Sequence, residues 1–297
     1  MNSLRDAILR HTDAHANAGG DGVAPSPIPG LGTVRACAPS GLLHAIPRPL
    51  VCLVLQGSKH VDFGKQGFDF QAGDSLLVTA NVPTVSQVTR ASLAAPYLAL
   101  VLELDPAIIA ELAGRMDDDG PGDAAPVRFE RTDDDVASVA LRLMRLLDRP
   151  DAVPVLHAPL VRELHYWLLA GRHGMALRAL GGQDSRARRV ERAVALLRAE
   201  FARPLPVERL AAAAGMSPSS FHQHFRTATS LSPLQFQKQL RLIEARRRMV
   251  SEGANASTAA FAVGYESVPQ FTRDYARLFG QPPVRDAKAV RQRALAA

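Results

Sequence analysis

Residues 210–217 read LAAAAGMS, a stretch in which a small residue, Ala211, precedes Gly215 by four positions. In a helix-turn-helix the first helix packs tightly against the second, so the residue at the contact must be small. The turn between the two helices needs a positive φ, which glycine adopts without steric cost. The stretch therefore predicts a turn between two short helices.

The second of these helices is predicted from its start and from its apolar spacing. Ser217 is a favourable N-cap, and Pro218 takes the first helical position, where its missing N–H costs nothing. Phe221 and Phe225 are four residues apart, so both point to one side, toward a core. The predicted outward-facing residues of this helix are Ser219, Ser220, His222, Gln223 and Arg226.

The same arrangement recurs closer to the C-terminus. Residues 260–265 read AFAVGY, with Ala260 again four positions before Gly264. Ser267 is the expected cap, and the inward pair is Phe271 and Tyr275, again four apart. Because two copies share cap, turn and aromatic pair, we predict helix-turn-helix units at about 207–227 and 256–278. The second helix of the later unit presents Pro269, Gln270, Thr272 and Arg273.

Charge is distributed unevenly between the two parts of the chain. The 297 residues carry a net charge of +6, but residues 186–297 hold 19 Lys and Arg against 8 Asp and Glu, a balance of +11. A basic domain beside an acidic body indicates that one domain meets a polyanion. A helix from Pro233 to about Met249 would be roughly 25 Å long, which could hold two reading helices in successive major grooves.

The C-terminal third resembles the DNA-binding domain of the AraC/XylS family of bacterial transcription regulators. The matching motifs are Leu210-Ala211, Gly215, Phe221 and Phe225, Ser232-Pro233, Arg241-Leu242 with Ala245-Arg246, Val263-Gly264-Tyr265, and Phe279-Gly280 with Pro282-Pro283. The resemblance implies two helix-turn-helix subdomains that bind double-stranded DNA as one rigid unit. Pro269 departs from the family pattern, which has a polar, base-reaching residue there, so we expect the second helix to read sequence weakly.

The N-terminal half has the texture of a β domain followed by helices. Short apolar runs such as Val51–Leu55 and Tyr97–Leu102 alternate with turns, which is typical of an antiparallel sandwich or barrel. Asp105 and Pro106 then begin a helix, and only helices are expected after it. Pro27–Leu31, Cys52–Gly57 and Pro96–Leu100 resemble the cupin-like regulatory domain of one AraC-type subgroup.

The predicted fold class is α+β, with a cupin-like barrel and dimerising helices before an all-α double helix-turn-helix domain. We expect a helix and flexible arm over 1–25, an effector-binding and dimerisation domain over 26–183, and a DNA-binding domain over 184–297. Within the middle domain the barrel covers about 30–104 and the helices 105–180. A homodimer is expected through the helix at 133–147 or at 159–169, with Trp167 either the interface anchor or packed on its own domain.

Cupins can be metal enzymes, but the ligands are not apparent here. A cupin metal site needs paired histidines and a carboxylate on adjacent strands, whereas His44 and His60 stand alone. His11 and His15 are four apart, and we expect them to be solvated in a mobile arm. No Gly-x-Ser-x-Gly elbow or Walker phosphate loop occurs. We therefore predict no metal, no cofactor and no enzyme activity.

Cys37 and Cys52 have two interpretations. They are either thiol sensors in an effector pocket or small buried apolar residues. Cys52 lies within an apolar run and is expected to be packed, whereas Cys37 precedes Pro39 by two positions and is expected to be more exposed.

These features together predict a cytoplasmic transcription regulator controlled by a small effector of unknown identity. No apolar run is long enough to span a bilayer, and residues 1–15 do not have the pattern of a secretory signal. RNA polymerase is a further candidate partner. The alternative is a cupin-type ligand-binding protein or enzyme whose basic tail binds nucleic acid nonspecifically.

Overall fold

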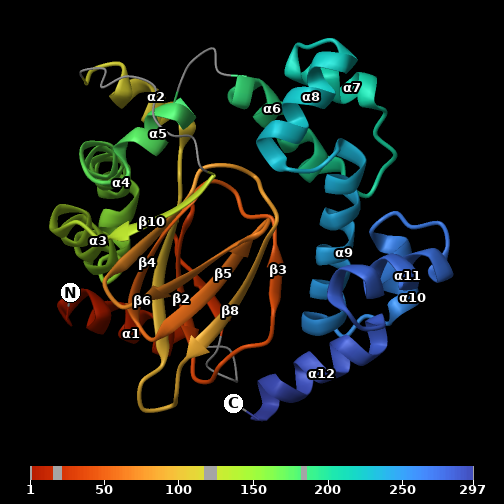
Figure 1. The fold of residues 1–297 in the computed structure, drawn as a ribbon. Coiled ribbons are helices and arrows are strands. Elements are labelled where there is room, and N and C mark those ends of the chain that lie inside the picture. The colour runs from red at the N-terminus through yellow and green to blue at the C-terminus, as the bar shows by residue number, and fades with distance from the viewer. Residues whose placement is uncertain (1, 16–21, 117–125, 182–185, 297) are drawn as a thin grey trace. The chain divides into compact units, whose positions relative to one another are not determined.

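The computed structural model describes residues 2–15, 22–116, 126–181 and 186–296, and the chain forms two compact units (Figure 1). The first unit holds nearly all residues up to 185. The second holds residues 186–297 together with the short segments 44–46 and 81–83. No helix among the described residues is long and apolar enough to cross a membrane.

Two sheets form the centre of the first unit. One has six strands in the order β1-β2-β9-β4-β7-β10, and the other has four in the order β3-β8-β5-β6. The described strands thus form two open sheets and not the closed barrel that was expected. The strands are β1 Gly22–Pro25, β2 Leu31–Ala36, β3 Leu43–Ala45, β4 Leu50–Gln56, β5 Ser58–Phe63, β6 Gln66–Gln71, β7 Asp74–Val78, β8 Thr84–Arg90, β9 Tyr97–Glu103 and β10 Val127–Arg131.

The predicted run Val51–Leu55 lies at the middle of the larger sheet, in β4. It pairs antiparallel with β9 on one side and with β7 on the other, and all five of its residues are buried. A strand that is covered on both faces has no solvent side, which explains why its apolar residues are continuous instead of alternating.

Two edge strands differ from the sequence-based expectation. β1 lies in the segment predicted as a flexible arm, and it pairs antiparallel with β2. β10 lies where only helices were expected, and it pairs antiparallel with β7. Both strands are at the edges of the six-stranded sheet, where one neighbour supplies their hydrogen bonds and few buried side chains are needed.

The helices of the first unit share one core with the larger sheet. Leu4 and Ile8 of α1 are buried in this core, so the first helix is not a free arm. His11 is also buried, and its Nδ1 lies 3.0 Å from the hydroxyl of Thr33, which corrects the expectation that it is solvated. The helices are α1 Asn2–His15, α2 Pro106–Ala113, α3 Asp134–Leu146, the 3-10 turn Pro150–Ala152 (η1), α4 Val153–Ala170 and α5 Gly174–Gly181.

Helix starts in this unit follow the capping rules in part. The carboxylate of Asp105 accepts hydrogen bonds from the backbone N–H of Ala107 and Ile108, as predicted for the cap of α2. By contrast, α4 begins at Val153, and Pro159 lies inside it and not at its start. Pro154 already occupies the first turn of α4, which is the position that proline favours.

The second unit is entirely helical apart from its two short segments. Leu210, Phe221 and Phe236 belong to the core around the first helix-turn-helix, and Phe271 and Tyr275 to the core around the second. The helices are α6 Arg186–Glu200, α7 Val207–Ala214, α8 Pro218–Thr229, α9 Pro233–Ser251, α10 Ala256–Ala262, α11 Val268–Phe279 and α12 Pro283–Ala296.

Candidate nucleic-acid interface

The first turn forms as the spacing predicts. Gly215 ends α7 with φ 62° in the left-handed region. Ala211 is buried in the same core as the apolar residues of the following helix, α8. Ser217 caps α8 by accepting from the N–H of Ser220. The rings of Phe221 and Phe225 are fully buried with centroids 5.3 Å apart. The aromatic pair therefore fixes which side of α8 faces solvent.

The solvent side of α8 carries the predicted reading residues. Ser219, His222, Gln223 and Arg226 are exposed, and Ser220 is half-buried. A hollow of about 530 Å³ is lined by His222, Gln223, Arg226 and Thr227. Thr227 was not predicted, although it is four positions after Gln223 and so belongs to the same helix face.

The second turn shows why its glycine is needed. Gly264 has φ 88°, and a Cβ at this position would collide with the backbone carbonyl oxygen of Ala202. Ala260 is fully buried before the turn, and Phe271 and Tyr275 are fully buried after it. Both the positive φ and the close approach of the chain exclude a side chain at residue 264.

The outer side of α11 holds the second set of predicted residues. Pro269, Gln270 and Arg273 are exposed, and Thr272 is half-buried. Ser267 occupies the N-cap position of α11 but makes no side-chain cap hydrogen bond, which corrects the expectation that both units are capped alike. The turn before α11, residues 263–267, is two residues longer than the turn before α8, residues 215–217. The backbone at the two caps also differs, with φ −139° at Ser267 and −67° at Ser217.

A buried acid anchors α11 from the inside. Asp274 is 8% exposed and lies 3.0 Å from the ammonium of Lys238 on α9. The hydroxyl of Tyr265 donates to the same carboxylate oxygen at 3.4 Å. Burial, followed by the nearby Asp274 charge, raises the pKa of Tyr265, so its hydroxyl stays protonated and able to donate. Arg273 is thus presented by a helix that is fixed at the adjacent residue.

The long helix α9 joins the two helix-turn-helix units through polar contacts with backbone carbonyls. The guanidinium of Arg241 donates to the carbonyl of Phe201 at 2.7 Å and to that of Gly264 at 2.8 Å. The amide of Gln237 donates to the carbonyls of Phe201 and Arg203 at 2.9 and 2.7 Å. The helix α9 therefore contacts the chain at the end of α6, which is close to the first helix-turn-helix, and also the turn of the second helix-turn-helix.

A second ion pair fixes the last helix against α9. Arg246 and Asp286 are 2.8 Å apart, and both side chains are largely buried. The hydroxyl of Tyr275 donates to Asp286 at 2.8 Å, and the Arg246 guanidinium lies 5.0 Å from the centre of the Phe279 ring. Because these groups satisfy one another inside the unit, a ligand would meet exposed basic side chains such as Arg226 and Arg273 instead.

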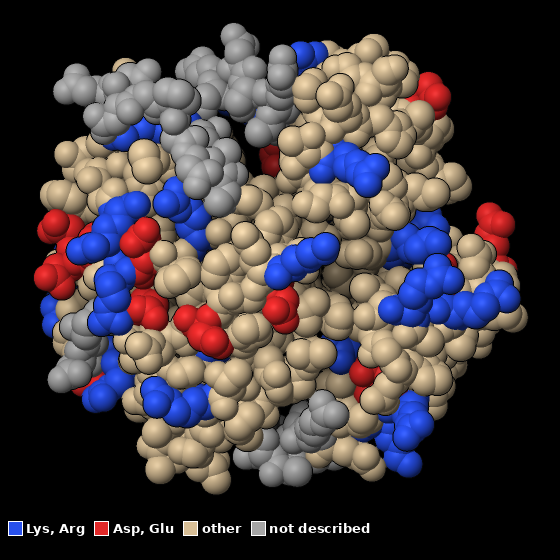
Figure 2. Space-filling view, in the orientation of Figure 1, with Lys and Arg blue, Asp and Glu red and all other residues tan. Residues whose placement is uncertain are grey.

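Basic side chains gather on the visible face of the second unit (Figure 2, right), with few acidic ones between them. This agrees with the +11 balance of residues 186–297. The positive field of such a surface attracts a polyanion and is weakened by salt.

Neither cysteine lies on an accessible surface. Both are buried, which is contrary to the expectation that Cys37 is the more exposed. Burial raises the pKa of the Cys52 thiol, which disfavours the thiolate that an electrophile would attack. Within the described parts of the chain, no three His, Cys, Asp or Glu residues are grouped so that they could hold a metal ion.

Two family profiles match the chain and show which family it belongs to. The family profile of the AraC-type transcriptional regulator N-terminus matches residues 27–176, about half of the chain. A helix-turn-helix domain profile matches residues 210–289. The chain belongs to the AraC-type transcriptional regulators. The resemblance inferred from the sequence motifs is confirmed, and so is the predicted α+β fold class with a β-rich first domain and a helical C-terminal domain, although the described strands form no closed barrel.

Solved structures share the fold of this AraC-type chain at low sequence identity. A ligand-free variant of ToxT from Vibrio cholerae aligns with a TM-score of 0.61 and 8% identity, over 89% of this chain and 98% of ToxT. ToxT bound to an unsaturated fatty acid aligns with a TM-score of 0.58 and 9% identity, over 87% and 93%. These likenesses describe the fold.

Curated relatives match this AraC-type chain over shorter stretches. YneL of Escherichia coli K12, named as an HTH-type transcriptional regulator, is 59% identical over 39 residues, 13% of this chain. The HTH-type transcriptional regulator GbdR of Pseudomonas aeruginosa is 28% identical over 95 residues, 32% of this chain. The chain spans 66% of the length of YneL and 26% of that of GbdR.

Proposed function

We propose that this chain is a sequence-specific DNA-binding transcription regulator whose activity is controlled by a small effector. The observation that carries the proposal is the pair of helix-turn-helix units, each with an exposed second helix, joined by the contacts of α9. Two reading helices on one scaffold suit successive major grooves of duplex DNA. The exposed basic surface supplies the attraction to phosphates.

On α8, we assign base contacts to Ser219, His222 and Gln223, and a phosphate contact to Arg226. Gln223 is exposed within the hollow of α8, and glutamine can pair bidentately with adenine. Ser220 is half-buried, so its contribution would be to the DNA backbone close to the helix.

The test for α8 is the change Gln223→Ala. A bidentate pair is worth about 1–3 kcal/mol of discrimination, so the variant should accept all four bases at one position of the selected site. Selection from random duplex DNA followed by sequencing measures this preference. Gln292→Ala, an exposed glutamine on α12, is the matched control and should leave the preference unchanged.

On α11, we assign a guanine contact to Arg273, with Gln270, Thr272 and Pro269 beside it. Arg273 is exposed and its helix offers few other groups for base hydrogen bonds. Arg273→Ala should therefore weaken binding to the selected site and spare random DNA. Equal losses on both, with a log–log salt slope smaller by about one, would indicate a phosphate contact instead.

The first unit would hold the effector and the dimer contact. ToxT, which shares the fold, is known with a bound unsaturated fatty acid, and this supports control of the present chain by a small molecule. We retain the limits 1–25, 26–183 and 184–297 for the arm, effector and DNA-binding regions. A thiol-sensing role for Cys37 and Cys52, and a contact with RNA polymerase, stay predictions.

A further inference from the structure

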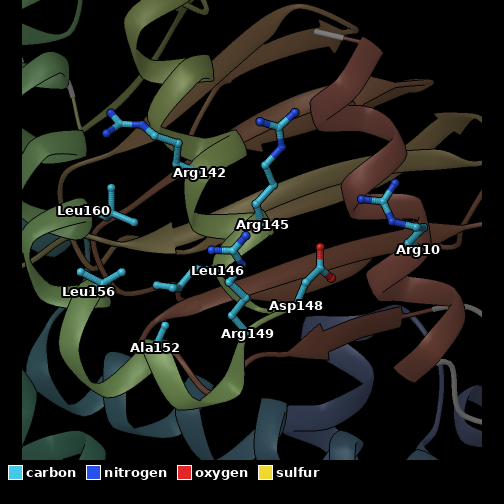
Figure 3. A pocket seen from close by; sticks show the side chains of 9 residues that line it. All are labelled: Arg10, Arg142, Arg145, Leu146, Asp148, Arg149, Ala152, Leu156 and Leu160. Carbon is cyan, nitrogen blue, oxygen red and sulfur yellow. The ribbon is translucent and has the colours of Figure 1, made fainter.

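The described surface of the first unit has a basic cleft that is lined by residues of α1, α3, η1, α4 and the segment between α3 and η1 (Figure 3). The cleft is open to solvent and has a volume of about 560 Å³, which is within the range of small-molecule sites. Its lining residues are Arg10, Arg142, Arg145, Leu146, Asp148, Arg149, Ala152, Leu156 and Leu160.

The charges in the cleft are not balanced by the protein. Arg142 pairs with Glu163. Among the described residues, Arg10, Arg145 and Arg149 have no ion-pair partner; Arg10 lies on α1, Arg145 on α3, and Arg149 directly before η1. Three such guanidinium groups against the single carboxylate of Asp148 leave two positive charges. A ligand with two negative charges would neutralise them.

The type of cation also restricts the ligand. A guanidinium presents a planar fork of N–H donors that matches the oxygens of a phosphate or carboxylate. Arg10 and Arg149 flank Asp148, and Arg145 lies beside them (Figure 3). A compact oxyanion placed there would meet several donors at once.

One side of the cleft is apolar. In Figure 3 the side chains of Leu156 and Leu160 on α4 lie apart from Arg10 and Asp148, with Ala152 below them. Leu156 is 47% exposed, so part of its apolar side chain is open to solvent at the cleft. An apolar group attached to the oxyanion would cover this wall.

We propose that this cleft binds a doubly charged organic oxyanion with an apolar body, such as an aryl phosphate monoester or an aromatic dicarboxylate. As an effector site the cleft rests on the proposed function, but the binding itself does not. Failure of binding would therefore leave the assignment of α8 and α11 to DNA unaffected.

The test is calorimetric titration of the full chain, without DNA, with four probes. 1-Naphthyl phosphate and a naphthalene dicarboxylate carry two charges, 1-naphthalenesulfonate carries one, and inorganic phosphate has no apolar body. We expect one or both dianions to bind at least about tenfold more tightly than the sulfonate and than inorganic phosphate. Whichever dianion binds more tightly shows whether the cleft prefers a phosphate or two carboxylates.

Three variants locate the site. Arg145→Gln should weaken dianion binding at least about tenfold, because one charge-assisted contact is removed. Leu156→Asn should weaken the naphthyl probes several-fold and leave inorganic phosphate unchanged. Arg90→Gln removes an exposed arginine of β8 on the same unit and should change nothing. All three positions are exposed, so the variants should melt near the wild-type temperature.

The proposal is overturned by any of three results. These are the absence of binding by both dianions, equal affinity for the sulfonate and the dianions, or equal affinities of Arg145→Gln and Arg90→Gln.

Discussion

His173 shows how one buried side chain links the stability of the first unit to pH. It is 3% exposed, and its Nε2 lies 2.7 Å from the hydroxyl of Ser75 on β7. Burial lowers the pKa of His173 from 6.5 to about 4. The folded state therefore keeps the imidazole neutral at pH values where the unfolded chain takes up a proton.

The sign of the effect follows from this difference. Stability from His173 is complete above pH 6.5, is lost as the pH falls from 6.5 to 4, and is constant below that. The full loss would be about 3 kcal/mol. Urea unfolding at pH 7.5 and pH 4.5 should show a smaller drop for His173→Asn than for wild type. His222→Asn, an exposed control, should behave as wild type, and an identical drop in all three proteins would contradict the prediction.

The size and polarity of individual side chains explain which site residues could be found from sequence. Phe221, Phe225, Phe271 and Tyr275 are large and apolar, so their spacing alone identifies the inner side of each reading helix. Thr227 was missed because a threonine near a helix end carries no such signal. The burial of His11 depends on a contact with Thr33 of β2, twenty-two positions away, and no local pattern records that neighbour.

At the scale of helices and turns, the two reading helices differ in their caps. The Ser217 hydroxyl accepts a backbone hydrogen bond at the start of α8, whereas Ser267 makes none at the start of α11. Loss of an N-cap hydrogen bond costs about 1 kcal/mol. Ser217→Ala should therefore lower the free energy of unfolding by about that amount, and Ser267→Ala by much less. Chemical unfolding of the two variants measures the difference, and equal losses would show that the caps are equivalent.

The helices whose starts or ends carry capping residues, prolines or glycines were predicted best. The starts of α2 and α8 are marked by a cap followed by proline, and the ends of α7 and α10 by glycines with positive φ. The edge strands β1 and β10 have no such marks. Their existence depends on an open edge of the six-stranded sheet, which is a property of the assembled sheet and not of their own residues.

For the molecule as a whole, exposed apolar side chains on one face of α4 suggest where a homodimer contact would form. Val155 and Tyr166 of α4 are 72% and 40% exposed, and eleven residues separate them, close to three helical turns. Trp167, by contrast, is half-buried and packs against the core of its own unit, which favours a packing role. We expect a homodimer through the face of Val155 and Tyr166.

Light scattering at micromolar concentration tests this expectation. Wild type should have the mass of a dimer, and Val155→Glu should have that of a monomer, because a buried unpaired carboxylate opposes association. Leu93→Glu introduces the same charge at another exposed apolar position and should remain dimeric. A monomeric wild type, with and without DNA, would contradict the dimer.

The central claim is that the two exposed helices read sequence and do not merely supply positive charge. The measurement that tests it most directly is the ratio of dissociation constants of the full chain for its best selected duplex and for a scrambled duplex, at one fixed salt concentration. We expect the selected duplex to bind at least about 10³-fold more tightly, as specific DNA-binding proteins do. Equal affinities for the two duplexes would contradict it and would leave only nonspecific attraction to the +11 charge of residues 186–297.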